Sequence, residues 1–216
     1  MPKRFKFFID DELHFACNLK PHQCSAVKPN GQQCSKRTVI GTDMCWTHLL
    51  YRKHLRIKNS NVAGGGKGLF ALDPKRVNNE IIFRTGQTII FYGGDVISKP
   101  ELDRRYDEYT APYGVQIQGV DGNGRQLYRD TACDRGIGSL ANHGNANREN
   151  ARFSFGNNGV LNLKATKNIR NAKEIFVNYN RGATRGDPTR YILNEAGIES
   201  KTVNVSDANM QNYYRR

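Results

Sequence analysis

Four of the five cysteines lie close together near the amino end, and their placement constrains this segment more than any other feature of the sequence. Cys17, Cys24, Cys34 and Cys45 fall within 29 residues, whereas Cys133 stands alone. We expect no secretory signal, because acidic residues at positions 10–12 interrupt the basic start before an apolar stretch can form. The spacing therefore disfavours a disulfide framework and favours metal binding.

Three thiolates and one imidazole, the ligands of a tetrahedral structural zinc site, are supplied by Cys24, Cys34, Cys45 and His48. The last two ligands are three residues apart, a spacing that places both on one face of a helical turn. Pro29-Asn30-Gly31 and Gly41 supply turns between the ligands. Because the segment has few apolar residues, bound zinc would contribute the missing folding free energy, on the order of 10 kcal/mol.

The same segment resembles a short Cys3His zinc-binding repeat found in proteins of large DNA viruses and some protists. The shared pattern, C-x-A-x-x-x-x-G-x-x-C followed by G and by C-W-x-H, is matched at Ala26, Gly31, Gly41 and Trp46. What the repeat binds does not follow from the resemblance. Cys17 and His22 remain alternative metal ligands.

The chain is strongly basic, with a net charge of +13 and a pI of about 9.7. Residues 1–60 hold 11 Lys and Arg against 4 Asp and Glu, so the amino-terminal quarter carries much of the surplus. Such a surface attracts polyanions, and we expect residues 1–60 to contact the phosphates, not the bases, of DNA or a nucleosome. The alternative is that these charges only keep the surface soluble.

No apolar stretch approaches the roughly 20 residues that cross a bilayer, so we expect no transmembrane helix and no membrane partner. Because we also expect no secretory signal, we expect the protein to be intracellular. If the protein is viral, we expect it in the host nucleus, the viral factory or the virion.

Short runs of β-branched and aromatic residues, bounded by Gly, Asn and Asp, predict a compact, mostly β domain. The predicted strands cover 81–83, 88–92, 113–120, 126–128, 151–155, 160–164 and 174–179. Helices are predicted at 100–109, after Ser98 as N-cap, and at 189–196. The glycine run at 64–66 is neither a P-loop nor a dinucleotide fingerprint, because Lys67 is followed by Gly68 and no amphipathic helix follows.

Four separated motifs resemble those of SET-domain lysine methyltransferases, in the family's order, over residues 55–181. They are GKGLFA at 66–71, FYGGDVI at 91–97, GSLANH at 138–143 and AKEIFVNY at 172–179. The resemblance implies small curved β-sheets with a carboxyl-terminal pseudoknot, a rare threaded topology. The predicted organisation is a basic segment with the zinc module at 1–54 (ligands within 24–48), a SET domain at 55–181 and a carboxyl-terminal segment at 182–216.

The resemblance also implies S-adenosylmethionine as methyl donor and a lysine as acceptor, entering from opposite faces. Donor binding would fall to Lys67, Gly68, Leu69, Asn142 and His143. The catalytic residues would be Tyr179, nearest the transferred methyl, and Tyr92, which would line the lysine channel. Tyr113 and Val177 would complete the channel, and bulk at Val177 can limit the number of methyls.

Three departures from the family pattern stand out. The segment after His143 is two residues longer to the last Asn and lacks Pro, which puts the rim of the donor pocket in doubt. Ala172 and Lys173 replace the usual glycine and first acid, a change expected at the surface. No Cys-x-Cys-x4-Cys follows Tyr179, so residues 181–216 must close the channel or leave it open.

Methyl transfer from a sulfonium to an amine is an in-line displacement that requires an uncharged amine. Deprotonating a lysine of pKa near 10.4 at pH 7 costs about 4.6 kcal/mol, and an apolar aromatic channel offsets part of this cost. The predicted function is therefore that of a protein-lysine N-methyltransferase acting on a histone or another chromatin-bound protein. The alternative is a non-catalytic, zinc-containing nucleic-acid or chromatin-binding protein on a SET scaffold.

Overall fold

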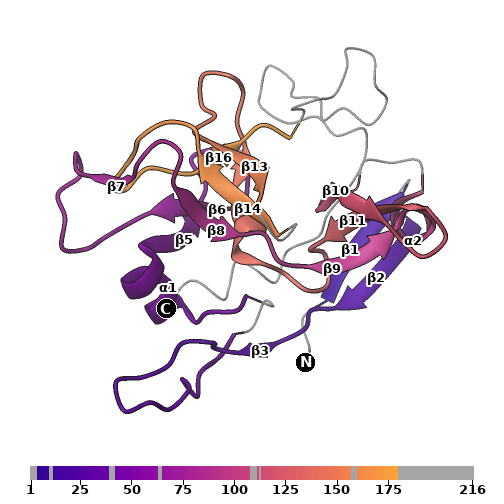
Figure 1. The fold of residues 1–216 in the computed structure, drawn as a ribbon, viewed down its shortest axis with the longest axis horizontal. Helices are drawn as coiled ribbons and strands as arrows, with labels where there is room; N and C mark the ends of the chain where they lie inside the picture. Colours follow the sequence, from indigo (N-terminus) through magenta and orange to yellow (C-terminus); the bar gives the residue numbers. More distant parts are fainter. Residues whose placement is uncertain are drawn as a thin grey trace.

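The computed structural model describes residues 4–9, 12–38, 42–62, 65–107, 111, 113–156 and 160–179. Within them the chain is mostly β, as predicted, and Figure 1 shows short strands in several small sheets. The strands of the amino-terminal third are β1 (Arg4–Ile9), β2 (Glu12–Asn18), β3 (His22–Gln23), β4 (Arg37–Thr38), β5 (Leu55–Asn59) and β6 (Lys67–Ala71). The later strands are β7 (Ile81–Phe83), β8 (Thr88–Phe91), β9 (Asp95–Ser98), β10 (Gly114–Val120), β11 (Gln126–Asp130), β12 (Asn142–His143), β13 (Ala151–Phe155), β14 (Leu161–Ala165), β15 (Ile169–Arg170) and β16 (Phe176–Val177). The helices are α1 (Trp46–Lys53), α2 (Lys99–Tyr106) and the short 3-10 helix η1 (Ile137–Leu140).

The largest sheet has the strand order β12-β16-β13-β14-β8. A second sheet has the order β10-β11-β9, and the pairs β1-β2, β3-β4, β5-β6 and β7-β15 form two-stranded sheets. All these pairs are antiparallel except those of β16, which runs parallel to both of its neighbours. The last strand of the described chain therefore sits inside a sheet built from earlier strands.

This insertion forms the pseudoknot that the resemblance implied. β16 lies between β12 and β13, which are joined by residues 144–150. Both ends of that connection are bonded to β16: the Gly144 amide donates to the Val177 carbonyl at 2.9 Å and the Asn150 amide to the Phe176 carbonyl at 3.2 Å. The fold expectation is thus confirmed.

Two glycines make the sharp turn between β8 and β9 possible. Gly93 and Gly94 have φ values of 41° and 101°, in the left-handed region that favours glycine. A Cβ on Gly94 would lie 2.6 Å from the carbonyl oxygen of Asp130, so a larger residue would push β9 away from β11. The turn places Tyr92 at the end of β8.

The hairpin β1-β2, which the sequence did not predict, belongs to the main core. Phe5 and Phe7 have no exposed surface and lie in one cluster with Leu49 of α1. The ring of Phe7 meets Tyr106 edge-on at 5.0 Å, and the ring of Phe5 meets Tyr113 at 5.7 Å. The amino-terminal segment therefore packs against the same core as the later strands, and the boundary between residues 54 and 55 stays a prediction.

Cys133 does not stand alone, which corrects the prediction from spacing. It forms a disulfide with Cys17 of β2, across 116 residues of sequence and with 5.8 Å between the Cα atoms. Beside this bond the Lys20 amide donates to the Cys133 carbonyl at 2.9 Å. Cys17 is therefore bonded elsewhere and is not an alternative metal ligand.

The predicted helices have different outcomes. α2 follows Ser98 as predicted but ends at Tyr106, because Asp107 takes a left-handed φ of 54°. The helix predicted at 189–196 lies outside the described residues. The strand predicted at 174–179 is reduced to β16, and no helix of the described residues is long and apolar enough to span a membrane.

Candidate functional site

A small hairpin brings the first two predicted zinc ligands together. β3 pairs with β4, and the bridge between Val27 and Gln33 continues the pairing toward the tip. The Cys34 amide donates to the Ala26 carbonyl at 2.7 Å, which turns the chain between the two cysteines. Cys24 and Cys34 are both buried on the inside of this turn.

The other two ligands come from the start of α1. Cys45 is the N-cap residue, and His48 lies in the first turn. The Nδ1 atom of His48 is 3.4 Å from the Sγ atoms of both Cys24 and Cys45, and all four ligand atoms lie within 4.8 Å of one another. Tetrahedral zinc would hold sulfur and nitrogen about 3.6 Å apart, given its usual bond lengths. The four residues therefore fit one zinc ion.

A second polar cluster lies at the pseudoknot, around the buried carboxylate of Glu174. Its Oε1 accepts hydrogen bonds from Ser60 Oγ at 2.7 Å and from Asn142 Nδ2 at 3.1 Å. Its Oε2 accepts one from the Asn61 amide at 2.7 Å. We call Glu174, Ser60, Asn61 and Asn142 the knot centre. Sequence reasoning did not assign Glu174 a role, and its only signal was its position in the closing motif.

Asn142, a residue predicted to bind the methyl donor, is held in place within the knot centre by Glu174. Its Nδ2 also donates to the Lys67 carbonyl at 3.0 Å, so both amide hydrogens have acceptors. Among the described residues no group donates to its Oδ1, which is left to accept a hydrogen bond from a ligand. Gly68 lies directly against this cluster, because a Cβ there would be 2.1 Å from Glu174 Oε1. The structure thus brings Lys67, Gly68 and Asn142 together.

His143 and Tyr179 interact across the parallel strands. The Tyr179 amide donates to His143 Nδ1 at 3.1 Å, and the two rings meet edge-on at 5.2 Å. An acceptor Nδ1 requires the tautomer with its proton on Nε2. Burial lowers the pKa of His143, although Glu149 acts in the opposite direction, so the neutral imidazole is favoured. The Tyr179 hydroxyl donates to the Ala141 carbonyl at 2.8 Å.

The two predicted channel tyrosines adjoin each other. The Tyr92 hydroxyl donates to the Tyr113 carbonyl at 3.2 Å, and its ring packs edge-on against Phe153 at 5.2 Å. Burial raises the pKa of Tyr92, so it remains a neutral phenol. The guanidinium of Arg135, a fully buried side chain, stacks on the Tyr113 ring at 4.4 Å. Arg135 carried no recognisable signal in the sequence.

Two predicted residues lie deeper than the rest. Leu69 has no exposed surface, and its backbone carbonyl accepts a hydrogen bond from the Ile175 amide at 2.7 Å. Val177 of β16 is 1% exposed and packs in the same core. Their side chains therefore belong to the hydrophobic core that supports the site.

The departures from the family pattern have clear structural forms. The longer segment after His143 makes an exposed turn, in which the Arg148 amide donates to the Asn145 carbonyl at 3.0 Å. Asn150 then returns to the knot, where its side chain donates to the Glu174 carbonyl and accepts from the Phe176 amide. Ala172 has a φ of 63°, so it adopts a conformation that suits the glycine it replaces.

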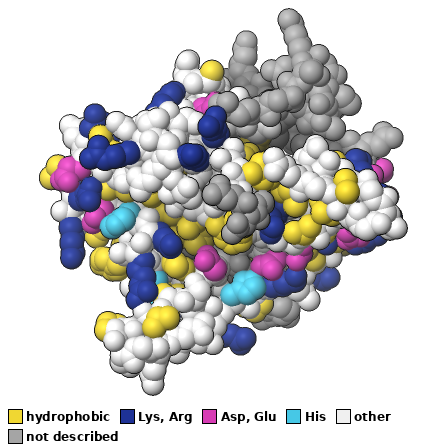
Figure 2. Space-filling model, in the orientation of Figure 1, with side chains coloured by type: hydrophobic (Ala, Val, Ile, Leu, Met, Phe, Trp, Pro, Cys, Tyr) yellow, Lys and Arg dark blue, Asp and Glu magenta, His cyan; other side chains and the backbone are white. Residues whose placement is uncertain are grey.

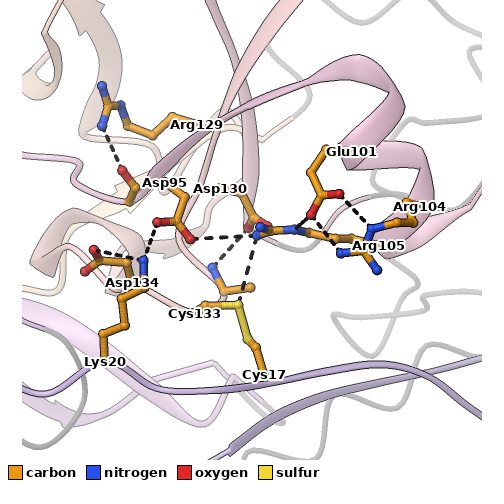
Figure 3. Close-up of polar contacts among 12 residues, drawn as sticks. Cys17, Lys20, Asp95, Glu101, Arg104, Arg105, Arg129, Asp130, Cys133 and Asp134 are labelled. Carbon is orange, nitrogen blue, oxygen red and sulfur yellow. Dashed lines mark hydrogen bonds and ion pairs between the residues drawn. A yellow bond between two sulfur atoms is a disulfide. The ribbon is translucent and has the colours of Figure 1, made fainter.

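A charged network supports the disulfide side of the site (Figure 3). Glu101 accepts hydrogen bonds from Arg104 and Arg105 of the same helix, and these bonds and the two positive charges lower its pKa to about 2, although burial acts in the opposite direction. Arg105 also donates to Asp130, a carboxylate with no exposed surface, at 2.8 Å. Tyr106 donates to the same carboxylate. α2 is thereby fixed to the end of β11, two residues before the turn that carries the disulfide.

Lys20 extends this network to the amino-terminal segment. Its Nζ lies 2.7 Å from Asp95 Oδ1 and 3.8 Å from Asp134, whose other carboxylate oxygen lies 2.7 Å from His22 Nε2. Hydrogen bonding to Asp95 raises the pKa of Lys20. His22 is therefore occupied with Asp134 and is not at the metal cluster.

The profile of the SET domain matches residues 66–180, which is more than half of the chain. A search of curated protein sequences gives no significant match.

Solved structures give distant matches. The Polycomb Repressive Complex 2 of Chaetomium thermophilum, in an autoinhibited conformation bound to S-adenosylmethionine, is 21% identical with a TM-score of 0.43; the match covers 58% of this chain and 15% of that one. The methyltransferase domain of human PR domain-containing protein 2 is 16% identical with a TM-score of 0.44, covering 58% and 76%. ATXR5, in complex with histone H3.1 mono-methylated on R26, is 16% identical with a TM-score of 0.45, covering 63% and 61%.

Proposed function

Because the chain belongs to the SET-domain family, we propose that it is an S-adenosylmethionine-dependent protein-lysine N-methyltransferase, with a histone tail or another chromatin-bound protein as substrate. The observation that supports this most is the knot centre. It fixes Asn142 beside Lys67 and Gly68 and leaves the Asn142 amide oxygen as an acceptor. These are the residues that the family resemblance assigns to the methyl donor.

The residues present fit S-adenosylmethionine. When bound, this cofactor supplies an electrophilic methyl group on a positively charged sulfur. Asn142 Oδ1 would accept a hydrogen bond from its ammonium group, and the backbone of Lys67 and Gly68 would border it. The neutral ring of His143, oriented by the Tyr179 amide, would pack against its adenine portion.

The acceptor lysine must lose its proton before it can react. Tyr92 and Tyr113, which adjoin each other, would provide aromatic walls that exclude water, and exclusion of water disfavours the ammonium form. Arg135 stacks on Tyr113 and adds a buried positive charge near this wall. The Tyr179 hydroxyl, held at the Ala141 carbonyl, would orient the neutral amine.

The amino-terminal cluster would hold a structural zinc ion. Three thiolates and one imidazole leave no open position for catalysis, because structural sites use four protein ligands. α1 begins at this cluster and contributes Leu49 to the main core. Zinc would therefore stabilise the domain that carries the site.

The test is to incubate the protein with isotopically labelled S-adenosylmethionine and a mixture of histones and lysate protein, then map labelled lysines by mass spectrometry. We expect label on lysine, lowered by orders of magnitude in Tyr179→Phe while donor affinity stays within a few-fold. The matched control is Tyr51→Phe, which removes a hydroxyl from an exposed tyrosine of α1 and should change nothing. No labelled lysine under any condition, or equal activity of Tyr179→Phe, would contradict the proposal.

A further inference from the structure

The basic side chains near the zinc cluster are not neutralised by carboxylates. From Cys24 to Val62 the chain has seven Lys and Arg but one acid, Asp43. Within the described part of the chain none of these seven cations forms an ion pair. Figure 2 shows several Lys and Arg side chains on the side of the molecule that carries α1, where a few acidic side chains also lie.

Trp46, the first residue of α1, lies among these cations. The side chain remains 48% exposed, although tryptophan is one of the largest apolar residues. The guanidinium of Arg56 lies 4.5 Å from the ring centroid, and Lys36 Nζ lies 6.0 Å from it. Lys58 follows Arg56 by two residues on β5, so both point to the same side of the strand. We call Lys36, Trp46, Arg56 and Lys58 the Trp46 patch.

An exposed aromatic ring beside cations that form no ion pair among the described residues favours some classes of binding partner over others. Cations alone suit any polyanion, including duplex DNA and anionic lipid. An exposed ring flanked by Arg and Lys suits a flat, apolar and electron-rich group joined to a negative backbone. Unpaired bases of a single-stranded nucleic acid have both properties, whereas bases inside a duplex are stacked on one another and cannot reach the ring.

We propose that the Trp46 patch binds single-stranded nucleic acid, with a base stacked on Trp46 and backbone phosphates at Lys36, Arg56 and Lys58. This surface lies outside the pseudoknot, so the inference does not depend on methyl transfer. Stacking tolerates any base, and binding is therefore largely independent of sequence. Three phosphate contacts give a slope of log K against log salt of about −2, at roughly −0.7 per phosphate on a single strand.

The chain offers a direct reporter, because Trp46 is its only tryptophan. Tryptophan fluorescence of the full, zinc-loaded chain should be quenched in a saturable way by a thymidine oligomer of about ten nucleotides. The same titration is run with a duplex of equal length, with polyglutamate and with phosphatidylserine vesicles. Stronger or equal response to any of these three would overturn the proposal, since each represents another class of partner.

Variants separate stacking from charge. Binding of a labelled oligomer should weaken roughly 5- to 100-fold in Trp46→Ala and less in Trp46→Phe, which keeps an aromatic face. The double variant Lys36→Ala/Arg56→Ala should weaken binding and reduce the salt slope by about 1.4.

The matched control is Lys99→Ala/Arg104→Ala on α2, which removes the same charge from residues paired with Asp103 and Glu101. It should leave binding close to wild type. An equal loss in this control would show a general effect of net charge and overturn the proposal. Zinc content is measured for every variant; because Trp46 adjoins the ligand Cys45, the Lys36/Arg56 variant decides the outcome if Trp46→Ala loses metal.

Discussion

Two regions of this molecule are held together in opposite ways. In the amino-terminal cluster all four ligands lie between Cys24 and His48, and neighbouring turns or the start of α1 place each of them. In the knot centre Glu174 collects donors from Ser60 and Asn61, which are 114 and 113 residues away. A local cluster can be recognised by its spacing, whereas a distributed one becomes visible only when the fold has brought its members together.

The largest effect is expected from breaking the local cluster. Cys34→Ser removes one of the four proposed zinc ligands, and metal binding supplies on the order of 10 kcal/mol in small zinc modules. We expect loss of zinc and loss of order in residues 20–50, with weaker packing of Leu49 in the core. Elemental analysis and amide exchange measure both. Stoichiometric zinc in Cys34→Ser, or no zinc in the wild type prepared without chelator, would contradict the assignment.

Breaking the distributed cluster should cost less. Glu174→Ala leaves three donors without their acceptor, so we expect a loss of about 3 kcal/mol in the free energy of unfolding. Binding of the methyl donor S-adenosylmethionine should weaken as well, because the Asn142 side chain loses one of its two hydrogen-bond acceptors. Denaturant unfolding measures the free energy of unfolding, and calorimetry measures the affinity for S-adenosylmethionine. Glu174→Gln keeps the shape of the side chain but not its charge, so its free energy of unfolding should fall between those of the wild type and Glu174→Ala. A wild-type free energy of unfolding in Glu174→Ala would show that the carboxylate is dispensable.

The disulfide lies outside both regions and links β2 to the turn after β11, so its removal tests whether the zinc cluster depends on a distant covalent link. Cys17→Ser/Cys133→Ser opens a covalent link across 116 residues and should lower the free energy of unfolding by about 2–4 kcal/mol. Zinc content should not change, since neither cysteine is a ligand. Loss of zinc in this double variant would mean that the cluster depends on a distant link, which would contradict its description as a local structure.

Some features of this structure can be predicted from the sequence, and others cannot. The Cys3His cluster follows from spacing and most strands of the later chain from alternation, which are local properties, whereas the four motifs follow from the family resemblance. The partner of Cys133 and the donors to Glu174 lie too far away in sequence for spacing to indicate them. The basic start of the chain does not by itself indicate the β1-β2 hairpin, although Phe5 and Phe7 face the core.

The network on α2 gives a smaller, pH-dependent effect. Arg104 and Arg105 lower the pKa of Glu101 from its ordinary 4.5 to about 2. A carboxyl with a depressed pKa stabilises the folded state above its unfolded pKa, and this stability is lost as the pH falls from 4.5 toward 2. The difference in unfolding free energy between wild type and Glu101→Gln should therefore shrink over this range. A constant difference would show that Glu101 does not titrate there.

The smallest effect concerns Ala172, in the turn that precedes β16. Ala172 has a positive φ of 63°, which costs a residue with a side chain roughly 1 kcal/mol relative to glycine. Ala172→Gly should therefore raise the free energy of unfolding by about 0.5 kcal/mol, after the greater entropy of glycine in the unfolded chain. Thermal unfolding checks it, with Ala146→Gly in the exposed turn as control. A clear loss of stability would mean that the Ala172 methyl group makes a contact worth more than the strain.

The most direct test of the central claim is calorimetric titration of the zinc-loaded chain with S-adenosylmethionine. If the pseudoknot holds a methyl donor, the titration gives one site per chain, and Asn142→Ala binds more weakly with the fold unchanged. The alternative, a SET scaffold whose working part is the zinc module, predicts no heat up to millimolar donor. Absence of binding by the intact, folded protein would contradict the claim that the pseudoknot holds a methyl donor.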